Sequence, residues 1–272
     1  MKKSKKQQKN FKIEKPDQKI KNEVLVLLLG VDGNNVTQEK GLRTDTMMLG
    51  KANFDTGEID LLSIPRDTRV KVKGKSDKIN HAHSYGGPEL ALKTVEDFLN
   101  VNIDYYVKVD FKGIKEIVDS IGGVELDIPR NMYYQDPVAK PPLRINLKAG
   151  LQTLDGQKAH DYLRFRSYPE GDIGRVQAQQ YFMKELVKQT LKPSNLFKID
   201  KLIKTYYDYV DTNISLGNML KYALSAGKLD IENINTTMIP GEGRYIGEGS
   251  YWVYDEQATN SLVELIFGDY RR

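Results

Sequence analysis

The pattern of apolar and polar positions predicts strands near the start of the chain. Residues 24–29 form a continuous apolar run that ends at Gly30, which is typical of a strand buried on both faces. Residues 45–49 and 59–64 have the composition of two further strands, and the Asp-Thr-Gly sequence at 55–57 predicts the turn between them. These three segments are therefore expected to start a β-sheet.

Helical spacing of apolar residues begins after these strands. Gly86-Gly87-Pro88 predicts the start of a helix, because proline in the first turn has no N–H to leave unpaired, and its apolar stripe runs to Leu99. Strands and helices then alternate to the end of the chain, which predicts a layered α/β fold. The further expected strands are 105–111, 124–128, 236–239 and 251–254. The further expected helices are 114–121, 155–163, 173–191, two short ones within 196–209 and 216–229, and one capped by Asp255 that ends near Phe267.

Composition describes a globular protein and removes several chemistries. Hydrophobic residues make up 39% of the 272 residues and charged residues 29%. There is no cysteine, so disulfides, zinc–thiolate sites and cysteine nucleophiles are excluded. The sequence also lacks a P-loop, a Gly-x-Ser-x-Gly motif and a His-Glu-x-x-His motif.

The net charge of +4 comes from the first residues. Residues 1–21 hold nine lysines against Glu14 and Asp17, which leaves 32 basic and 35 acidic residues in the remainder. The slightly acidic remainder gives no support to nucleic-acid binding. We expect residues 1–22 to be a disordered basic tail or a flank that lies against anionic lipid, and residues 23–268 to be a single catalytic domain.

Charged residues occur next to the predicted strands and helices in five places. In α/β folds such residues meet at one edge of the sheet, where ligands bind, provided that the strands are neighbours. The five places are Asp32, then Arg43-Thr44-Asp45, then Pro65-Arg66-Asp67, then Asp77-Lys78, and finally Arg164-Phe165-Arg166 with Asp172 and Arg175.

These residue types suit a phosphate group and a hard cation. Arginine forks match phosphate oxygens, and Mg²⁺ is usually held by one or two carboxylates together with substrate phosphates. If 164–166 is extended, Arg164 and Arg166 point the same way, because side chains two apart share a face. Each feature also has an ordinary explanation, since Arg66 with Asp67 resembles a structural ion pair and Asp32 a turn residue. His81 and His83 are expected to line a loop or to bond to backbone.

Eight motifs, in order from about residue 24 to 240, resemble the LytR-CpsA-Psr family of cell-wall glycopolymer transferases. The motifs are LLLGVD (27–32), RTDTMML (43–49), LLSIPRDT (61–68), DKINHAHSYGGPELALKTVE (77–96), DYYVKVDF (104–111), IGGVELDIP (121–129), LKAGLQTLDGQKAHDYLRFR (147–166) and GDIGRVQAQQ (171–180). The resemblance implies a three-layer α-β-α domain around a mixed central β-sheet, with an apolar channel for a prenyl chain.

The family resemblance also implies an activity. Such a protein is a Mg²⁺-dependent phosphotransferase that moves a glycopolymer, teichoic acid or capsule, from a polyprenyl-pyrophosphate lipid to a sugar hydroxyl of peptidoglycan. The alternatives are a polyprenyl-pyrophosphate pyrophosphatase and a non-catalytic regulator that binds wall polymer or lipid. The expected partners are the lipid-linked polymer, peptidoglycan and the membrane surface, with no nucleic acid.

The resemblance assigns roles to the residues that match its motifs. Asp32 and Asp45 would hold Mg²⁺, and Arg66 would bind the phosphates and act in catalysis. Asp172 is our hypothesis for the general base or for orienting the acceptor. Arg164 and Arg166 also match the arginines on the phosphates, and the expected supporting contacts are Arg43, Lys78, Arg175 and Gln179.

Three features depart from the family pattern. Gly33-Asn34-Asn35 follows Asp32 where many relatives carry Ser and Arg, and Ala178 stands where an Arg is frequent. No apolar span precedes residue 24, although the family places its members on the extracytoplasmic face of the membrane through such a helix. We therefore expect the lysine-rich start to be the inner flank of a span that has been removed from this chain.

Overall fold

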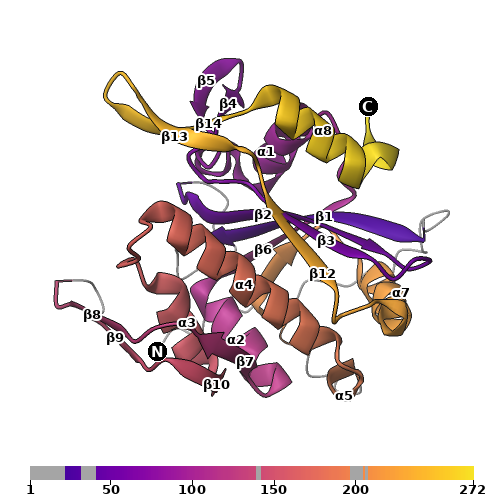
Figure 1. Cartoon of the computed structure of the whole chain (residues 1–272). Helices are drawn as coiled ribbons and strands as arrows, with labels where there is room; N and C mark the ends of the chain where they lie inside the picture. Colours follow the sequence, from indigo (N-terminus) through magenta and orange to yellow (C-terminus); the bar gives the residue numbers. More distant parts are fainter. Residues whose placement is uncertain (1–21, 32–40, 139–141, 197–204, 206–207) are drawn as a thin grey trace, which may run out of the picture.

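A mixed six-stranded β-sheet forms the centre of the protein (Figure 1). The computed structural model describes residues 22–31, 41–138, 142–196, 205 and 208–272. Strand β1 is parallel to β6 and β3 is parallel to β12, whereas the other neighbours are antiparallel. The strands, in order across the sheet, are β11 (Val210–Thr212), β6 (Tyr105–Asp110), β1 (Glu23–Val31), β2 (Thr44–Asn53), β3 (Ile59–Ser63) and β12 (Ile234–Met238).

Helices cover both faces of this sheet, and the expected three-layer α-β-α architecture is confirmed. Helices α1 (His81–Leu99) and α8 (Glu256–Phe267) lie on one side (Figure 1). Helices α2 (Phe111–Ile121), α3 (Gly156–Arg164) and α4 (Asp172–Leu191) lie on the other. The apolar run of β1 is buried because alternate side chains face the two helical layers.

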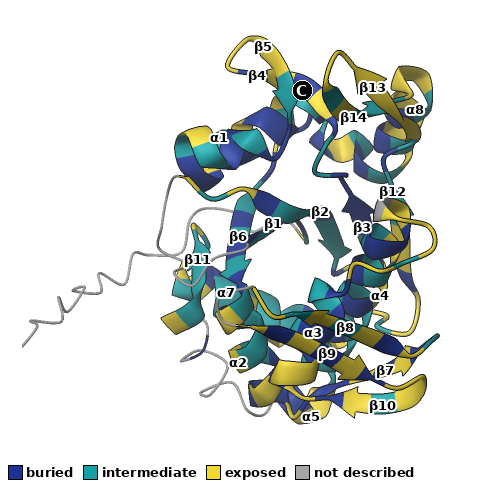
Figure 2. Cartoon of the chain, turned by 90° about the vertical axis from the view of Figure 1, so that its left-hand side faces the viewer, coloured by how far each residue is buried: buried dark blue, intermediate teal, exposed yellow. Residues whose placement is uncertain are grey.

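Four hairpin-like pairs of strands lie outside the central sheet, and the apolar pattern predicted only parts of them. The pairs are β4 (Arg69–Val72) with β5 (Lys75–Lys78), β7 (Val124–Ile128) with β10 (Gly150–Leu154), β8 (Met132–Asp136) with β9 (Leu143–Leu147), and β13 (Gly241–Ile246) with β14 (Gly249–Tyr254). Strand β7 alternates between buried and exposed residues and was predicted from this pattern, whereas β13 is exposed throughout and β5 has no buried residue, so the apolar signal of these two strands is weak (Figure 2).

Helix α1 begins earlier than its sequence predicted. The helix starts at His81, and Gly86 and Gly87 interrupt it with non-helical backbone angles, including φ 74° at Gly87. Glycine tolerates this positive φ, and Pro88 then restarts the helix. The expected start at Gly86 is therefore a kink, and the preceding turn carries His81 and His83 into the site described below.

The other expected helices agree more closely with the structure. Asp155 and Asp255 cap α3 and α8, because their carboxylates accept hydrogen bonds from Lys158 N (2.8 Å) and Ala258 N (2.9 Å). Short helices α5 (Pro193–Leu196) and α7 (Leu216–Ser225) follow α4. The helix expected within 196–209 lies largely outside the described residues.

The main core lies between the sheet and the α1–α8 layer. Leu27 and Leu49 have no exposed surface and pack there with Val95 and Phe267. Burial of such side chains is the main stabilising contribution that the fold receives from this face of the sheet.

We expect Leu27→Ala to lower the free energy of unfolding by about 2–5 kcal/mol, because it removes buried methyl groups and leaves a cavity. The matched control is Leu265→Ala on α8, whose side chain is 83% exposed and whose effect should stay within about 0.5 kcal/mol. Urea unfolding followed by circular dichroism measures both. Equal destabilisation by the two variants would contradict this assignment of the core.

Candidate functional site

The ends of three neighbouring strands meet at one edge of the central sheet. Val31 at the end of β1 pairs with Thr44 at the start of β2, and Met48 of β2 pairs with Ser63 at the end of β3. The predicted convergence required these three strands to be neighbours, and the sheet order shows that they are. Residues that follow β1 and β3, or that begin β2, are thus brought to a common edge.

Arg66 and Asp45 form an ion pair at this edge. The Nη1 atom of Arg66 lies 2.7 Å from Oδ1 of Asp45, and the two side chains are 27% and 22% exposed. Asp67 lies 3.7 Å from Arg66 Nε and accepts from Lys78 Nζ at 2.7 Å. Four charges of alternating sign therefore lie within reach of solvent, so a charged ligand can approach them.

Backbone hydrogen bonds fix the loop that carries Arg66. The hydroxyl of Thr68 donates to Pro65 O (2.6 Å), and the N–H of Asn80 donates to Arg66 O (3.2 Å). The N–H of Trp252 in β14 donates to Asp67 O (2.9 Å). The loop is held from both the start of α1 and the β13–β14 hairpin, which limits the movement of the Arg66 side chain at its base.

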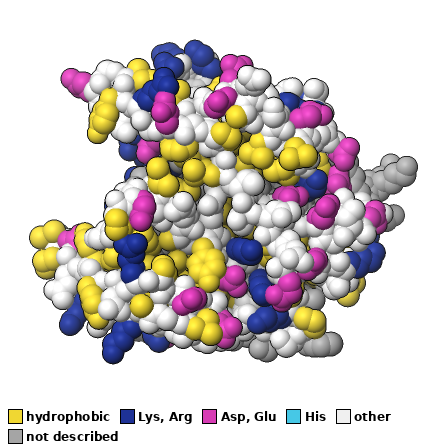
Figure 3. Space-filling view, in the orientation of Figure 1, with side chains coloured by type: hydrophobic (Ala, Val, Ile, Leu, Met, Phe, Trp, Pro, Cys, Tyr) yellow, Lys and Arg dark blue, Asp and Glu magenta, His cyan; other side chains and the backbone are white. Residues whose placement is uncertain are grey.

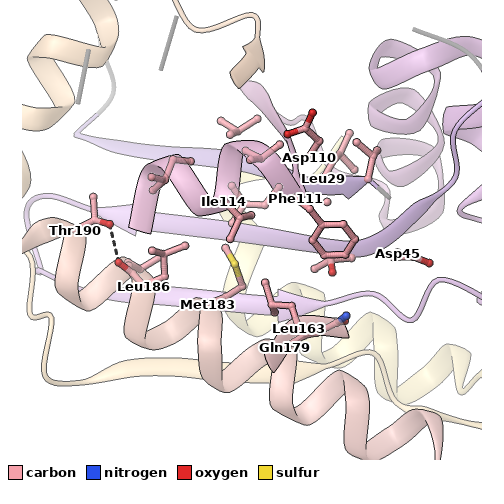
Figure 4. A pocket seen from close by; sticks show the side chains of 18 of the residues that line it. Leu29, Asp45, Asp110, Phe111, Ile114, Leu163, Gln179, Met183, Leu186 and Thr190 are labelled. Atoms are coloured by element: carbon pink, nitrogen blue, oxygen red, sulfur yellow. Dashed lines mark hydrogen bonds between the residues drawn. The ribbon is translucent and has the colours of Figure 1, made fainter. Parts of the chain in front are cut away.

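An apolar cavity of about 280 Å³ opens beside the ion pair, between the sheet and helices α2 and α4 (Figure 4). Its wall is almost entirely apolar, and the polar side chains Asp45, Asp110 and Gln179 also line it. The labelled apolar side chains in Figure 4 are Leu29, Phe111, Ile114, Leu163, Met183 and Leu186.

A smaller recess joins the cavity to the charged edge. Arg66 and Val176 line this recess, and Asp45, Thr46 and Gln179 line both the recess and the cavity. The site is therefore amphiphilic, with ionic groups at its rim and a hydrophobic interior. Charged side chains of both signs also occur over the face seen in Figure 3, and that face shows no continuous basic surface.

The structure brings four of the predicted site residues together. Asp45, Arg66 and Gln179 line one recess, and Lys78 joins them through Asp67. Arg164 is placed beside the cavity, because its guanidinium carbon lies 5.8 Å from the ring centroid of the cavity residue Phe111.

The other predicted site residues do not line the recess beside the Arg66–Asp45 pair, or they lie outside the described part of the chain. Arg43 and Arg166 are exposed, and Arg175 is a buried residue of α4. Asp32 lies outside the described residues, one position after Val31 of the cavity wall, and Asp172 begins α4 with a side chain that also lies outside the description. Their roles stay predictions.

One geometric condition set in the sequence analysis is not met. Arg164 is the last residue of α3, so residues 164–166 do not form an extended stretch, and the argument that Arg164 and Arg166 share a strand face does not apply. Phe165 is buried between them. Phe165 is the C-cap of α3, and its extended backbone (φ −66°, ψ 132°) ends the helix.

Asp45 is the described residue at this edge whose chemistry suits a Mg²⁺ ligand. Within them, no group of three or more His, Asp or Glu residues is arranged to hold a metal. Asp45 uses Oδ1 for Arg66, and its Oδ2 has no hydrogen-bond partner in the described part of the chain. One or two carboxylates are enough for Mg²⁺ when substrate phosphates supply further oxygens, so Asp45 fits such a role.

The two histidines near the site have different environments. His83 is buried and its Nδ1 bonds to Leu42 O at 2.8 Å, as expected of a backbone-bonded histidine. Burial lowers the pKa of His83, and the charge of Lys108 adds to this effect, so the neutral form is favoured. His81 instead pairs with Asp77 through Nδ1 (2.8 Å), which the sequence analysis did not predict.

Asp110 is a further site residue that the sequence analysis missed. Its carboxylate caps α2 by accepting from Gly113 N (2.7 Å), and the residue lines the cavity (Figure 4). Its signal was an aspartate at the end of the predicted strand 105–111, followed by the apolar helix stripe. No helix in the described ranges has the length and hydropathy needed to cross a membrane.

Curated relatives match most of this chain. TagV of Bacillus subtilis (strain 168), named polyisoprenyl-teichoic acid–peptidoglycan teichoic acid transferase, is 32% identical over 240 residues, which cover 86% of this chain and 61% of TagV. TagU of the same organism, with the same enzyme name, is 32% identical over 265 residues, covering 96% of this chain and 81% of TagU. The expectation of an enzyme family is confirmed by these names.

Solved structures agree with the sequence relatives. The crystal structure of B. subtilis TagV superposes with a TM-score of 0.78 at 31% identity and covers 93% of this chain and 100% of that one. A structure described as TagT bound to LI-WTA gives a TM-score of 0.74 at 25% identity, covering 95% and 94%. The LytR_cpsA_psr family model matches residues 1–266, and this chain therefore belongs to the LytR-CpsA-Psr family.

Proposed function

We propose that this protein transfers a teichoic-acid-type glycopolymer from a polyprenyl-pyrophosphate carrier to a sugar hydroxyl of peptidoglycan, with Mg²⁺ as cofactor. The observation that carries the proposal is that an apolar cavity opens at the Arg66–Asp45 pair. A lipid-linked pyrophosphate has the same division into an apolar chain and an anionic group. The transferase names of TagV and TagU support the choice of polymer and acceptor.

The charged edge would bind the pyrophosphate and neutralise charge in the transition state. Arg66 is the best-placed group, because its guanidinium lies in the recess that joins the cavity to the rim. Arg164, which lies next to the Phe111 ring, and Lys78, which is ion-paired with Asp67, would add positive charge near the phosphates. Mg²⁺, held by Asp45 and by Asp32, would supply further neutralisation of the phosphate oxygens. Arg166 stays a predicted phosphate contact, and Arg43, Arg175 and Gln179 stay predicted supporting contacts.

The cavity would hold the first part of the prenyl chain. Its wall is apolar, so binding the chain there removes hydrocarbon from water, while polar groups at the rim keep the phosphates outside. Because the proposed donor is a lipid and the proposed acceptor is peptidoglycan, the proposal includes a position of the protein at the extracytoplasmic surface of the membrane. Product analysis decides between transfer and simple pyrophosphate hydrolysis, since only transfer yields a glycan adduct.

Arg66→Ala is expected to lower kcat/KM for release of polyprenyl phosphate on the order of 10²–10³-fold, because it removes one charge-stabilising donor. The control is Arg144→Ala on the exposed side of β9, which should leave the rate unchanged. Chromatographic assay of the lipid product with a peptidoglycan acceptor measures both variants. An Arg66→Ala protein as active as the wild type would refute the role of this side chain.

Removal of divalent cations with EDTA is expected to abolish transfer, and added Mg²⁺ should restore it. Asp45→Asn should raise the Mg²⁺ concentration needed for half-maximal rate, because an amide oxygen is a weaker ligand than a carboxylate. Asp127→Asn on β7, an exposed position, is the matched control. Full activity in EDTA would overturn the cofactor assignment and leave the other assignments in place.

Met183→Trp is expected to weaken binding of a polyprenyl phosphate, because the larger side chain fills the cavity between α4 and the sheet. Leu224→Trp places the same side chain at a position that is 84% exposed and should bind the lipid like the wild type. Isothermal titration in detergent measures the affinity, and thermal unfolding verifies that both variants are folded. Unchanged affinity of Met183→Trp would exclude the cavity as the lipid site.

A further inference from the structure

His81, Asp77 and Tyr85 form a hydrogen-bonded group to which neither the family resemblance nor the proposed transfer assigns a role. Nδ1 of His81 lies 2.8 Å from Oδ1 of Asp77, and the hydroxyl of Tyr85 donates to Oδ2 of the same carboxylate at 2.8 Å. The rings of His81 and Tyr85 are edge to face, with centroids 5.9 Å apart. The orientation of the imidazole is therefore fixed from two sides.

Asp77 favours one tautomer of His81. Burial raises the pKa of the Asp77 carboxyl, but hydrogen bonds from Lys78 N (2.7 Å), Tyr85 and His81 outweigh it and hold the pKa below its ordinary value. An ionised carboxylate accepts from Nδ1–H, which leaves the lone pair on Nε2. Nε2 has no hydrogen-bond partner in the described ranges, and the His81 side chain is 17% exposed.

The turn that carries His81 is bonded to both segments of the charged edge. Asn80, one residue before, donates its N–H to Arg66 O (3.2 Å). Ser84, three residues after, accepts at its carbonyl from Gly41 N (3.1 Å), in the segment that leads into β2 and Asp45. The turn of residues 80–84, which carries His81, is therefore hydrogen-bonded to the backbone of both segments.

His81 and the apolar cavity belong to opposite layers of the fold. The cavity lies between the sheet and helices α2 and α4, whereas His81 begins α1 in the other layer (Figures 1 and 4). In phosphoryl transfer the attacking and leaving oxygens are roughly in line across the phosphorus. If the prenyl phosphate departs on the side of the cavity, with its chain inside and its phosphate at the rim, the acceptor hydroxyl has to approach from the α1 side.

We propose that His81 is the general base that takes the proton of the acceptor hydroxyl, with Asp77 as its positioning residue. The hydroxyl oxygen forms a bond to the phosphorus that carries the polymer, and the bond from that phosphorus to the bridging oxygen breaks. The electron pair leaves with the polyprenyl phosphate. The proton moves from the hydroxyl to Nε2 of His81 and is lost to solvent after the product departs.

Other charged groups around His81 are compatible with this role. Lys78 precedes it on β5 and is engaged by Asp67 (2.7 Å), and Lys73 Nζ bonds to Tyr85 O (3.4 Å). The positive charge of Arg43 acts on the hydroxyl of Tyr85, whose pKa is nevertheless raised, chiefly by its hydrogen bond to Asp77. Tyr85 therefore remains a hydrogen-bond donor and keeps Asp77 in place.

The decisive variant is His81→Asn, because its side-chain amide can still donate to Asp77 but has no basic nitrogen. We expect kcat for glycan transfer to fall on the order of 10²–10⁴-fold, with unchanged affinity for the polyprenyl-pyrophosphate donor and unchanged thermal unfolding. The acidic limb of the pH–rate profile should disappear in this variant. Added imidazole should partly restore the rate of His81→Ala.

The control is Lys93→Asn, which removes an exposed ion pair of the same spacing, Lys93 with Asp97, farther along α1. It should transfer like the wild type. If His81→Asn also transfers like the wild type, His81 only stabilises the start of the helix, the inference is overturned, and the predicted role of Asp172 as base is favoured.

This inference rests on the proposed transfer, and the two fail in different ways. A wild-type protein that binds the donor but releases no polyprenyl phosphate in the presence of peptidoglycan overturns both. An active wild type with an equally active His81→Asn overturns the general base alone. Loss of activity in His81→Asn together with lost donor affinity would also overturn it, because a base for the acceptor does not bind the donor.

Discussion

The ion pair between Arg66 and Asp45 is the interaction around which the site is built. It joins the end of β3 to the start of β2, and it lies in the recess that leads into the apolar cavity. A pyrophosphate that accepts hydrogen bonds from Arg66 would compete with Asp45 for the guanidinium. Asp45 would then have both carboxylate oxygens available for a cation, so phosphate and metal binding would favour each other, as linked equilibria require.

The antiparallel register of β1, β2 and β3 is what makes this pair possible. Val31 is opposite Thr44 and Met48 is opposite Ser63. The chain that follows Ser63 therefore runs alongside the start of β2, which brings Arg66 to Asp45. The loop after β3 is then held by hydrogen bonds from Asn80 and Trp252, so the charged edge is supported by both α1 and β14. Site geometry and fold stability depend here on the same backbone contacts.

The sequence was informative where burial sets the pattern. The continuous apolar run of β1 and the strands after it predicted the sheet, and the position of Arg66 and Asp45 beside those strands predicted that they would meet. The sequence was less informative where strands and turns are built mainly from polar residues. The β4–β5 hairpin carries little apolar signal, so the sequence did not predict it. Without that hairpin, the sequence gives no reason to expect that the Asp77 carboxylate lies against the His81 ring. The four-residue spacing of these two residues was visible, but it spans a strand, a turn and the first residue of a helix, where helical spacing rules do not apply.

The cavity decides what kind of ligand the charged edge serves. Arginine and aspartate at a sheet edge would bind a free phosphate or nucleotide equally well, and neither of these needs a deep apolar wall formed by α2 and α4. Filling that space with solvent would be unfavourable, because its lining offers almost no hydrogen-bond partners. A ligand with a hydrocarbon chain beside its phosphate avoids this cost, and its chain also fixes which phosphate oxygen leaves toward α4. In the proposed transfer, the opposite approach to the phosphorus would then be left for the acceptor hydroxyl, on the side of the α1 layer that carries His81.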